Sequence, residues 1–173
     1  MSRDLNLDML FQAMALLKDV PGIKLLCVGP EADLSELIGK YGISATCQLA
    51  GTIHPAGVQP PYPDLINIYR SANLYVSTSY LESFGSAAAD ALACGIPVLV
   101  GKDHGVRDLV REGKNGFTIA VETPSGLAEQ IRALAAQKAE LLDRKTEIRQ
   151  SVEHLTWQNI AIRALEVYKK MVV

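Results

Sequence analysis

Residues 80–100 read YLESFGSAAADALACGIPVLV, and the expected fold follows from this segment. It comes after an apolar run at residues 74–78 and ends in a second one at residues 96–100, and both runs are typical of buried strands. Between them, Ala and Leu favour a helix that Ser83 is expected to cap and that Gly95 is expected to end. The segment therefore predicts a strand, a tight turn, a helix and a second strand.

The turn before this helix is the predicted ligand site. In an open parallel sheet, ligands bind at the carboxyl ends of the strands, where a helix N-terminus offers backbone N–H groups to an anion. Glu82 and Gly85 lie in the turn, and Asp90 follows inside the helix. Helical spacing places Ser83, either Ser86 or Ala87, and Asp90 on one face. We therefore expect a carboxylate and a pair of hydroxyls to face the same crevice.

These residues resemble a known family. The pattern Glu-x-Phe-Gly from Glu82, the acidic Asp90 in an Ala-rich helix, and Ala-Cys-Gly-x-Pro-Val at residues 93–98 are similar to the second Rossmann-like domain of retaining GT-B glycosyltransferases of the GT4 type. The resemblance extends over almost the whole chain, with Val-Gly-Pro-Glu at residues 28–31 and Thr-Trp at residues 156–157. It implies a glycosyltransferase of glycan biosynthesis.

The resemblance assigns roles by position. In that family the first acid of the pattern reaches the donor sugar, the Phe-Gly turn presents N–H groups to the diphosphate, and the second acid holds the ribose. The implied catalytic residue is Glu82, and the implied donor-binding residues are Ser83, Phe84, Gly85, Ser86 and Asp90. Asp90 departs from the family, which usually has Glu there. The loop at residues 51–63 corresponds to a segment near the nucleotide base, so Thr52 and Ile53 are base-pocket candidates.

Two further segments depart from the family pattern. Residues 103–108 match a segment that usually reads Gly-Gly-x-x-Glu, but His104 replaces the first Gly and Asp108 replaces the Glu. A metal role for His104 is not favoured, because no second ligand follows at a useful spacing. In the family, a strand ending in Gly-Arg and a following Lys open the domain and grip the diphosphate. Here the Lys position falls near Leu5, and Arg3 is the nearby cation.

The resemblance thus implies a fragment. The opening strand of the family would lie between the strands expected at residues 23–28 and 74–78, and the acceptor-binding first domain would be supplied in cis or by another chain. We expect the isolated chain to transfer no sugar. The sheet should be left with apolar inner edges, which favour association and slippage.

The rest of the chain alternates helices and strands. Helices are expected at residues 5–18, 32–41, 64–72, 103–112 and 124–150, and strands at residues 23–28, 46–50 and 116–120. This order predicts an α/β fold, a Rossmann-like parallel sheet with helices on both faces and right-handed crossovers. Thr156 is a good N-cap for a final helix whose apolar stripe includes Trp157, Ile160 and Leu165. We therefore expect a docking helix within residues 152–173.

Composition limits the possible classes of protein. Of 173 residues, 49% are hydrophobic and 21% are charged, and the net charge is −2. These values are typical of one globular domain, so we expect residues 1–173 to form a single donor-binding domain. The absence of a Lys/Arg block argues against nucleic acid or a membrane surface as the partner.

Cysteine usage and hydropathy predict the compartment. Cys27, Cys47 and Cys94 are far apart in apolar segments, which fits neither a disulfide framework nor a metal site. No signal peptide and no transmembrane segment are predicted. We therefore expect a cytoplasmic protein, peripheral at the inner membrane only through a further domain.

The predicted function is the donor-binding half of a retaining glycosyltransferase that moves a hexose from a nucleoside diphosphate sugar to a glycan, lipid or small-molecule acceptor. Backbone N–H groups and cations can stabilise the departing diphosphate, so no metal or other cofactor is expected. Two alternatives remain open at this point. One is a sugar-nucleotide epimerase of the same architecture, and the other is a non-catalytic module that binds a nucleotide or a protein partner.

Overall fold

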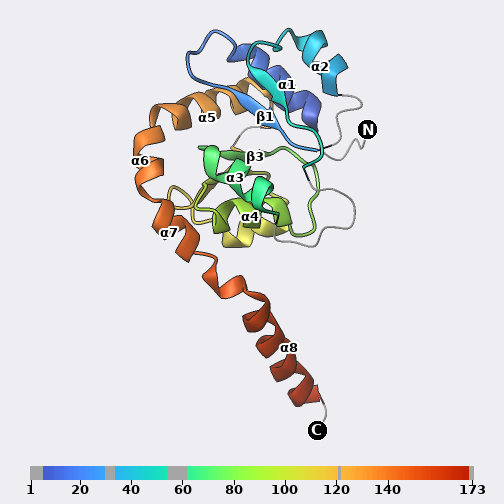
Figure 1. The fold of residues 1–173 in the computed structure, drawn as a ribbon, viewed down its shortest axis with the longest axis vertical. Helices are drawn as coiled ribbons and strands as arrows, with labels where there is room; N and C mark the ends of the chain where they lie inside the picture. The colour runs from blue at the N-terminus through green and yellow to red at the C-terminus, as the bar shows by residue number, and fades with distance from the viewer. Residues whose placement is uncertain (1–5, 30–33, 54–61, 121, 172–173) are drawn as a thin grey trace.

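The computed structural model describes residues 6–29, 34–53, 62–120 and 122–171 (Figure 1). Arg3, Leu5 and most of the loop at residues 51–63 lie outside these ranges. The helices are α1 (Leu7–Leu16), α2 (Leu34–Tyr41), α3 (Pro63–Ser71), α4 (Ser86–Ala93), α5 (Pro124–Ala136), α6 (Lys138–Asp143), α7 (Lys145–Gln150) and α8 (Trp157–Met171), with short 3₁₀ turns η2 (Gly105–Leu109) and η3 (Glu153–Leu155). The strands are β1 (Leu25–Cys27), β2 (Cys47–Leu49), β3 (Tyr75–Ser77), β4 (Val98–Val100) and β5 (Gly116–Thr118).

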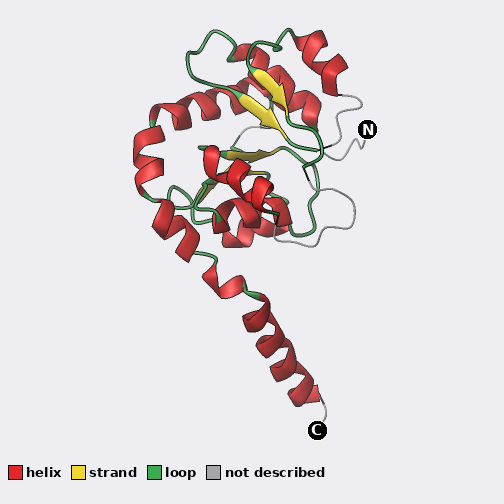
Figure 2. Cartoon of the chain, viewed as in Figure 1, coloured by secondary structure: helices red, strands yellow, loops and turns green. Residues whose placement is uncertain are grey.

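The strands form two parallel sheets. One has the order β1-β2 and the other the order β3-β4-β5, with Tyr75 opposite Val98 and Val98 opposite Gly116. Figure 2 shows helices on either side of these strands. The predicted α/β class and the parallel strands are confirmed, and helices α2 and α4 form the connections from β1 to β2 and from β3 to β4. β1 and β3, which the family's opening strand would separate, belong to different sheets.

Two apolar clusters hold the sheets and helices together. The first joins α1 and α5 to the β1 side of the chain, and Phe11 and Leu127 in it are fully buried. The second packs α4 and α7 against β4, and its buried members include Leu92 and Ile148. β4 is the middle strand of its sheet, and all three of its side chains are inaccessible. Helix α4, which follows the predicted turn, therefore packs on the most buried strand of the described residues.

The C-terminal half differs from the expected single helix at residues 124–150. The chain forms α5, α6 and α7 instead, with breaks at Gln137 and Arg144, where ψ rises to 11° and 8°. These breaks let the chain bend around the domain so that α7 reaches α4. Contact between the two helices is close, since a Cβ on Gly95 would come within 2.8 Å of the Lys145 carbonyl oxygen. Gly95 has φ +79°, as expected for a residue that ends a helix.

Helix α8 extends away from the rest of the chain (Figure 1). It contains no buried residue, and Trp157 at its start is 84% exposed. The expected docking of this helix is therefore not made onto the described residues and stays a prediction. None of the described helices combines the length and the apolar character that crossing a membrane would require.

Candidate functional site

Helix α4 begins two residues later than expected. Its N-cap is Gly85, with φ 82° and ψ 56°, and no side chain caps the helix. The prediction that Ser83 caps the helix is therefore wrong, and Ser83 does not share a helical face with Asp90. The physical reason is Gly85, whose left-handed backbone turns the chain sharply at a point where L-residues are strained. The first-turn N–H groups, which have no acceptor within a helix, are left without a side-chain cap.

The turn is held by the loop that follows β4. The Gly105 N–H donates to the Glu82 carbonyl oxygen at 2.9 Å, and Glu82 and His104 form a parallel β-bridge. A Cβ on Gly105 would lie 2.1 Å from the Ser83 carbonyl oxygen, so only glycine fits there. The expected helix at residues 103–112 is reduced to η2, because this backbone is paired with the turn.

His104 also joins the loop after β4 to the segment that leads into the turn. It is 4% exposed, and its Nε2 lies 2.7 Å from the Ser79 carbonyl oxygen. A carbonyl oxygen only accepts, so Nε2 carries the proton that makes this bond. Sequence reasoning considered His104 only as a metal ligand and missed this role. The signal was present in the Gly-Lys-Asp-His-Gly order, since Gly101 has no room for a side chain beside the His104 ring.

The predicted donor-binding residues lie together on the outside of this turn. Glu82 is partly buried, while Ser83, Ser86 and the 46%-exposed Phe84 are accessible. A Cβ on Gly85 would meet Val106 of η2 at 3.2 Å and the Glu82 Cγ at 3.3 Å. The turn is therefore packed against η2 on one side and open on the other.

Glu82 and Asp90 share a neighbour, Tyr75 of β3. Burial raises the pKa of Tyr75 most, and the negative charges of Glu82 and Asp90 raise it further. Burial also raises the pKa of Tyr69 in α3, with smaller contributions from Tyr75 and Asp90. The Tyr69 and Tyr75 rings are 6.3 Å apart and line one groove. Both predicted carboxylates thus act electrostatically on Tyr75, and Asp90 acts on Tyr69 as well.

The base-pocket candidates lie on that groove as well. Thr52 and Ile53 follow β2, and they line the groove together with Ala87 from the first turn of α4. Thr52 is exposed and Ile53 is partly buried. The structure therefore connects these two residues to the start of α4, although they are more than thirty positions earlier in the sequence.

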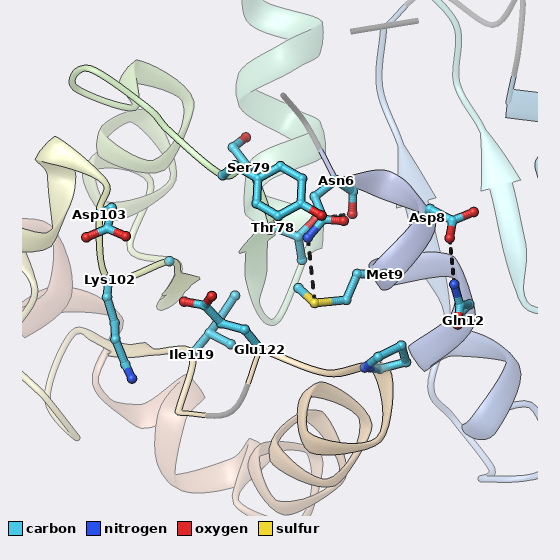
Figure 3. Close-up of a pocket in the computed structure, with 13 residues that line it drawn as sticks. Asn6, Asp8, Met9, Gln12, Thr78, Ser79, Lys102, Asp103, Ile119 and Glu122 are labelled. Atoms are coloured by element: carbon cyan, nitrogen blue, oxygen red, sulfur yellow. Dashed lines mark hydrogen bonds between the residues drawn. The ribbon is translucent and has the colours of Figure 1, made fainter. Parts of the chain in front are cut away.

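A second cavity, of about 380 Å³, opens at the carboxyl ends of the three-stranded sheet (Figure 3). Thr78 and Ser79 reach it from β3, Lys102 and Asp103 from β4, and Glu122 from the segment after β5. None of the predicted donor-binding residues lines it. Sequence reasoning missed these residues, although each lies at the end of a predicted strand or within three residues of it, which is the signal that could have located them.

The carboxyl groups of Asp90 and Asp8 have pKa values shifted in opposite directions. Neighbouring atoms desolvate the Asp90 carboxyl and raise its pKa, although the residue is exposed. Asp8 in α1 accepts hydrogen bonds from Tyr41 and Gln12, and the bond from Tyr41 is the main cause of its lowered pKa. By linkage, the raised pKa of Asp90 gives folding stability that is lost as the pH rises above the ordinary Asp value of 3.8. The lowered pKa of Asp8 gives folding stability that is lost as the pH falls below 3.8.

We expect Asp90→Asn to remove the loss of stability with rising pH, and Asp8→Asn to remove the loss with falling pH. Urea denaturation of both variants and the parent chain, from about pH 3 to about pH 7, measures the difference. The two variants serve as controls for each other, since each replaces one exposed carboxylate by an amide. Parallel pH profiles for all three proteins would contradict the assignment.

Within the described ranges, no three His, Cys, Asp or Glu side chains are placed to hold a metal ion. Cys27, Cys47 and Cys94 are free thiols. Burial raises the pKa of Cys27 to about 12, which keeps this thiol protonated and unreactive near neutral pH.

Comparison with known proteins gives consistent results. Residues 1–151 match the model of a family described as "Glycosyl transferases group 1". A D-inositol 3-phosphate glycosyltransferase of Rhodococcus opacus is 31% identical over 145 residues, which cover 83% of this chain and 30% of that protein. Sucrose-phosphate synthase of Thermosynechococcus elongatus superposes with a TM-score of 0.82 and 25% identity, over 99% of this chain and 43% of that one. Anabaena HepE, solved in complex with UDP, superposes with a TM-score of 0.75 and 22% identity, over 99% of this chain and 46% of that one.

Proposed function

Because this chain belongs to the glycosyl transferases group 1 family, we propose that it forms the donor-binding part of a glycosyltransferase and holds a nucleoside diphosphate sugar at the start of α4. The chain spans 30% of the length of its Rhodococcus opacus relative. The complete enzyme, with an acceptor-binding domain in cis or in another chain, is part of this proposal.

The proposal rests mainly on the N-terminus of α4. Gly85 caps this helix without a side chain, so the N–H groups of Ser86 and Ala87 in the first turn are available to a diphosphate, while that of Ala88 donates to the Gly85 carbonyl oxygen. The exposed side chains of Ser83 and Ser86 lie beside these groups and can add hydrogen bonds. Because the turn is paired with Gly105 and packed on η2, its donors are held in place before the ligand binds.

Glu82 is the proposed catalytic residue. Its carbonyl oxygen is bonded to the Gly105 N–H, and this bond fixes the backbone from which the carboxylate projects. In this position the carboxylate orients a hexose attached to the diphosphate. The departing diphosphate carries the developing negative charge of the transition state, and the fixed N–H groups stabilise that charge without a metal. Transfer is proposed to proceed with retention at the sugar carbon.

Asp90 and the groove residues are proposed to hold the nucleoside. Asp90 lies one helical turn beyond Ser86, and its charge acts on Tyr69 and Tyr75. From there its carboxylate can accept hydrogen bonds from the ribose hydroxyls. Thr52 and Ile53 line the same groove and would contact the base.

A titration of the isotope-labelled chain with UDP, followed by amide NMR, tests the proposal. UDP is the probe because a protein with the same fold was solved in complex with it. We expect the largest shifts at Gly85, Ser86 and Ala87, because their N–H groups point at the diphosphate. Smaller shifts are expected at Thr52 and Ile53. Shifts centred on β1 and α2 would contradict this site.

A variant and a modified ligand test the ribose contact. We expect Asp90→Ala to weaken UDP binding about tenfold, and UDP without ribose hydroxyls to bind the parent chain about tenfold more weakly, since hydrogen bonds to a charged group are involved. When the variant is titrated with the modified ligand, the two losses of binding free energy should not add, because the substitution and the ligand change remove the same contact. Additive losses would place the ribose elsewhere. Glu129→Ala on the exposed face of α5 is the matched control and should bind like the parent.

A further inference from the structure

The cavity at the carboxyl ends of β3, β4 and β5 takes no part in the proposed donor site. Its volume of about 380 Å³ is at the lower end of the range for small-molecule sites, which suits a single ring rather than a nucleoside diphosphate sugar. Residues of α1 and α5 complete its walls. Figure 3 shows Lys102 and Asp103 on one side of the cavity, and Asp8 and Gln12 on the other. The cavity is therefore built from five separate elements of the fold.

Three charged side chains at the cavity are available to a ligand. Lys102, Asp103 and Glu122 are exposed, and none of them forms a hydrogen bond or an ion pair with another described residue. Asp8 is different, because hydrogen bonds from Tyr41 and from a neighbour within α1 already occupy its carboxylate. Two carboxylates and one ammonium group thus remain without a partner in the described part of the chain.

These charges decide which class of ligand fits. Two carboxylates against one ammonium group leave an excess of negative charge, so a phosphate or carboxylate ligand would meet like charges. The described residues offer no set of three His, Cys, Asp or Glu side chains for a metal ion. Carboxylates accept hydrogen bonds and an ammonium group donates them, so a neutral molecule with several hydroxyl groups can use all three. A neutral polyol therefore matches the charged groups.

The cavity also has an apolar part. Tyr80 comes shortly after β3 and lines the cavity, and 65% of its side chain is exposed although the ring has a large apolar face. Met9 and Ile119 add further apolar surface and are otherwise buried. A sugar or cyclitol ring has C–H groups on its faces and hydroxyl groups around its rim. An aromatic face beside a few polar groups is thus suited to such a ring.

We propose that this cavity binds one neutral polyhydroxylated ring, a sugar or a cyclitol. Asp103 and Glu122 accept hydrogen bonds from its hydroxyl groups, and Tyr80 packs against one of its faces. Hydrogen bonds to ionised carboxylates are the strong ones, so these two residues would contribute most of the polar affinity.

The cavity lies next to the proposed donor site. Ser79 lines the cavity, and its carbonyl oxygen accepts the hydrogen bond from His104 at 2.7 Å. His104 in turn forms the β-bridge with Glu82. The Ser79–His104 pair therefore joins the wall of the cavity to the turn that is proposed to hold the donor. A role of the bound ring as the sugar acceptor rests on the proposed function, and this chain would then contact both substrates.

Titrations of the isotope-labelled chain with D-glucose and with D-glucose 6-phosphate, followed by amide NMR, test the proposal. We expect glucose to shift the amides of Ser79, Lys102 and Ile119, with a dissociation constant on the order of 10 mM for so small a ligand. Glucose 6-phosphate should bind at least about tenfold more weakly, because its phosphate meets the two carboxylates. Equal affinities for the two sugars would overturn the proposal.

Substitutions at exposed positions identify the contacts. Glu122→Gln should bind glucose about fivefold more weakly, because a charge-assisted hydrogen bond is lost. Glu122→Lys should bind glucose 6-phosphate more tightly than glucose, since the excess charge at the cavity changes sign. Tyr80→Ala should also weaken glucose binding about fivefold. Its matched control is Tyr168→Ala in α8, where the side chain is 63% exposed, and this variant should bind like the parent.

A separate titration with UDP distinguishes this inference from the proposed function. Glucose shifts at the cavity support the inference even if UDP fails to shift Gly85 and Ser86. UDP shifts at these two residues, without any glucose shift up to about 100 mM, overturn the inference and leave the proposed function standing. Parent-like glucose binding in both Glu122→Gln and Tyr80→Ala overturns it too. In the full-length enzyme, Glu122→Gln should raise the KM for the acceptor and not for the donor, and the reverse result would reject the acceptor role.

Discussion

Replacing Glu82 by Gln in the full-length enzyme should lower kcat for sugar transfer by about 10²–10³, because such factors are typical for the loss of one fixed electrostatic contact to the transition state. The turn itself should persist, since the Gly105 N–H bonds to the backbone of Glu82 and not to its side chain. Gln keeps the shape of the side chain and removes only its charge. Steady-state kinetics with a nucleoside diphosphate hexose would measure the change.

Two further measurements make this prediction specific. UDP affinity of Glu82→Gln should stay within about threefold of the parent, because the diphosphate is proposed to bind backbone N–H groups rather than Glu82. Glu129→Gln, on the exposed face of α5, is the matched charge control and should retain full activity. If the Glu82→Gln variant has the same kcat as the parent, Glu82 is not the catalytic residue.

Gly105→Ala should destabilise the chain by about 3 kcal/mol, at the upper end of what overpacking usually costs. The new Cβ would lie 2.1 Å from the Ser83 carbonyl oxygen and 3.0 Å from the Phe84 Cα, both of which are backbone atoms. Neither can rotate away as a side chain would. The substitution must therefore separate the turn from the loop after β4. Urea denaturation would report the free energy of unfolding.

The matched control is Gly39→Ala in α2, where a Cβ meets nothing within 4 Å. Alanine is the better helix former, so this variant should gain about 0.5–1 kcal/mol. If the free energy of unfolding falls in Gly105→Ala and rises in Gly39→Ala, the close contact at residue 105, and not the loss of a glycine, causes the destabilisation. Gly105→Ala should also weaken UDP binding, because the N–H groups at Gly85 and Ser86 move with the turn. A stable Gly105→Ala variant would contradict the described contact.

The incorrect prediction of an N-cap at Ser83 shows the limit of what local sequence signals can predict. Ser followed by an Ala-rich run favours a cap at Ser83, and Gly85 was interpreted only as part of the diphosphate turn. The helix starts at Ser86 because Gly105 and Val106, about twenty positions later, pack against the turn and hold Gly85 in its left-handed conformation. Tertiary contacts readily override a local propensity such as the preference of Ser for the N-cap position.

Hydrophobic patterns located the five strands seen in the described residues and the α/β class, and the helix-ending preference of glycine located Gly95, because each depends on residues close in the sequence. Residue patterns were also enough to indicate the family. Only the tertiary structure decided how the turn is held, with His104 bonded to Ser79 across 25 positions. It alone showed that Glu82 and Asp90 both act electrostatically on Tyr75, and it alone separated the strands into two sheets with a groove between them. The physical reason is that these features depend on contacts between distant segments, whose free energy arises from packing and strand pairing that no local pattern records.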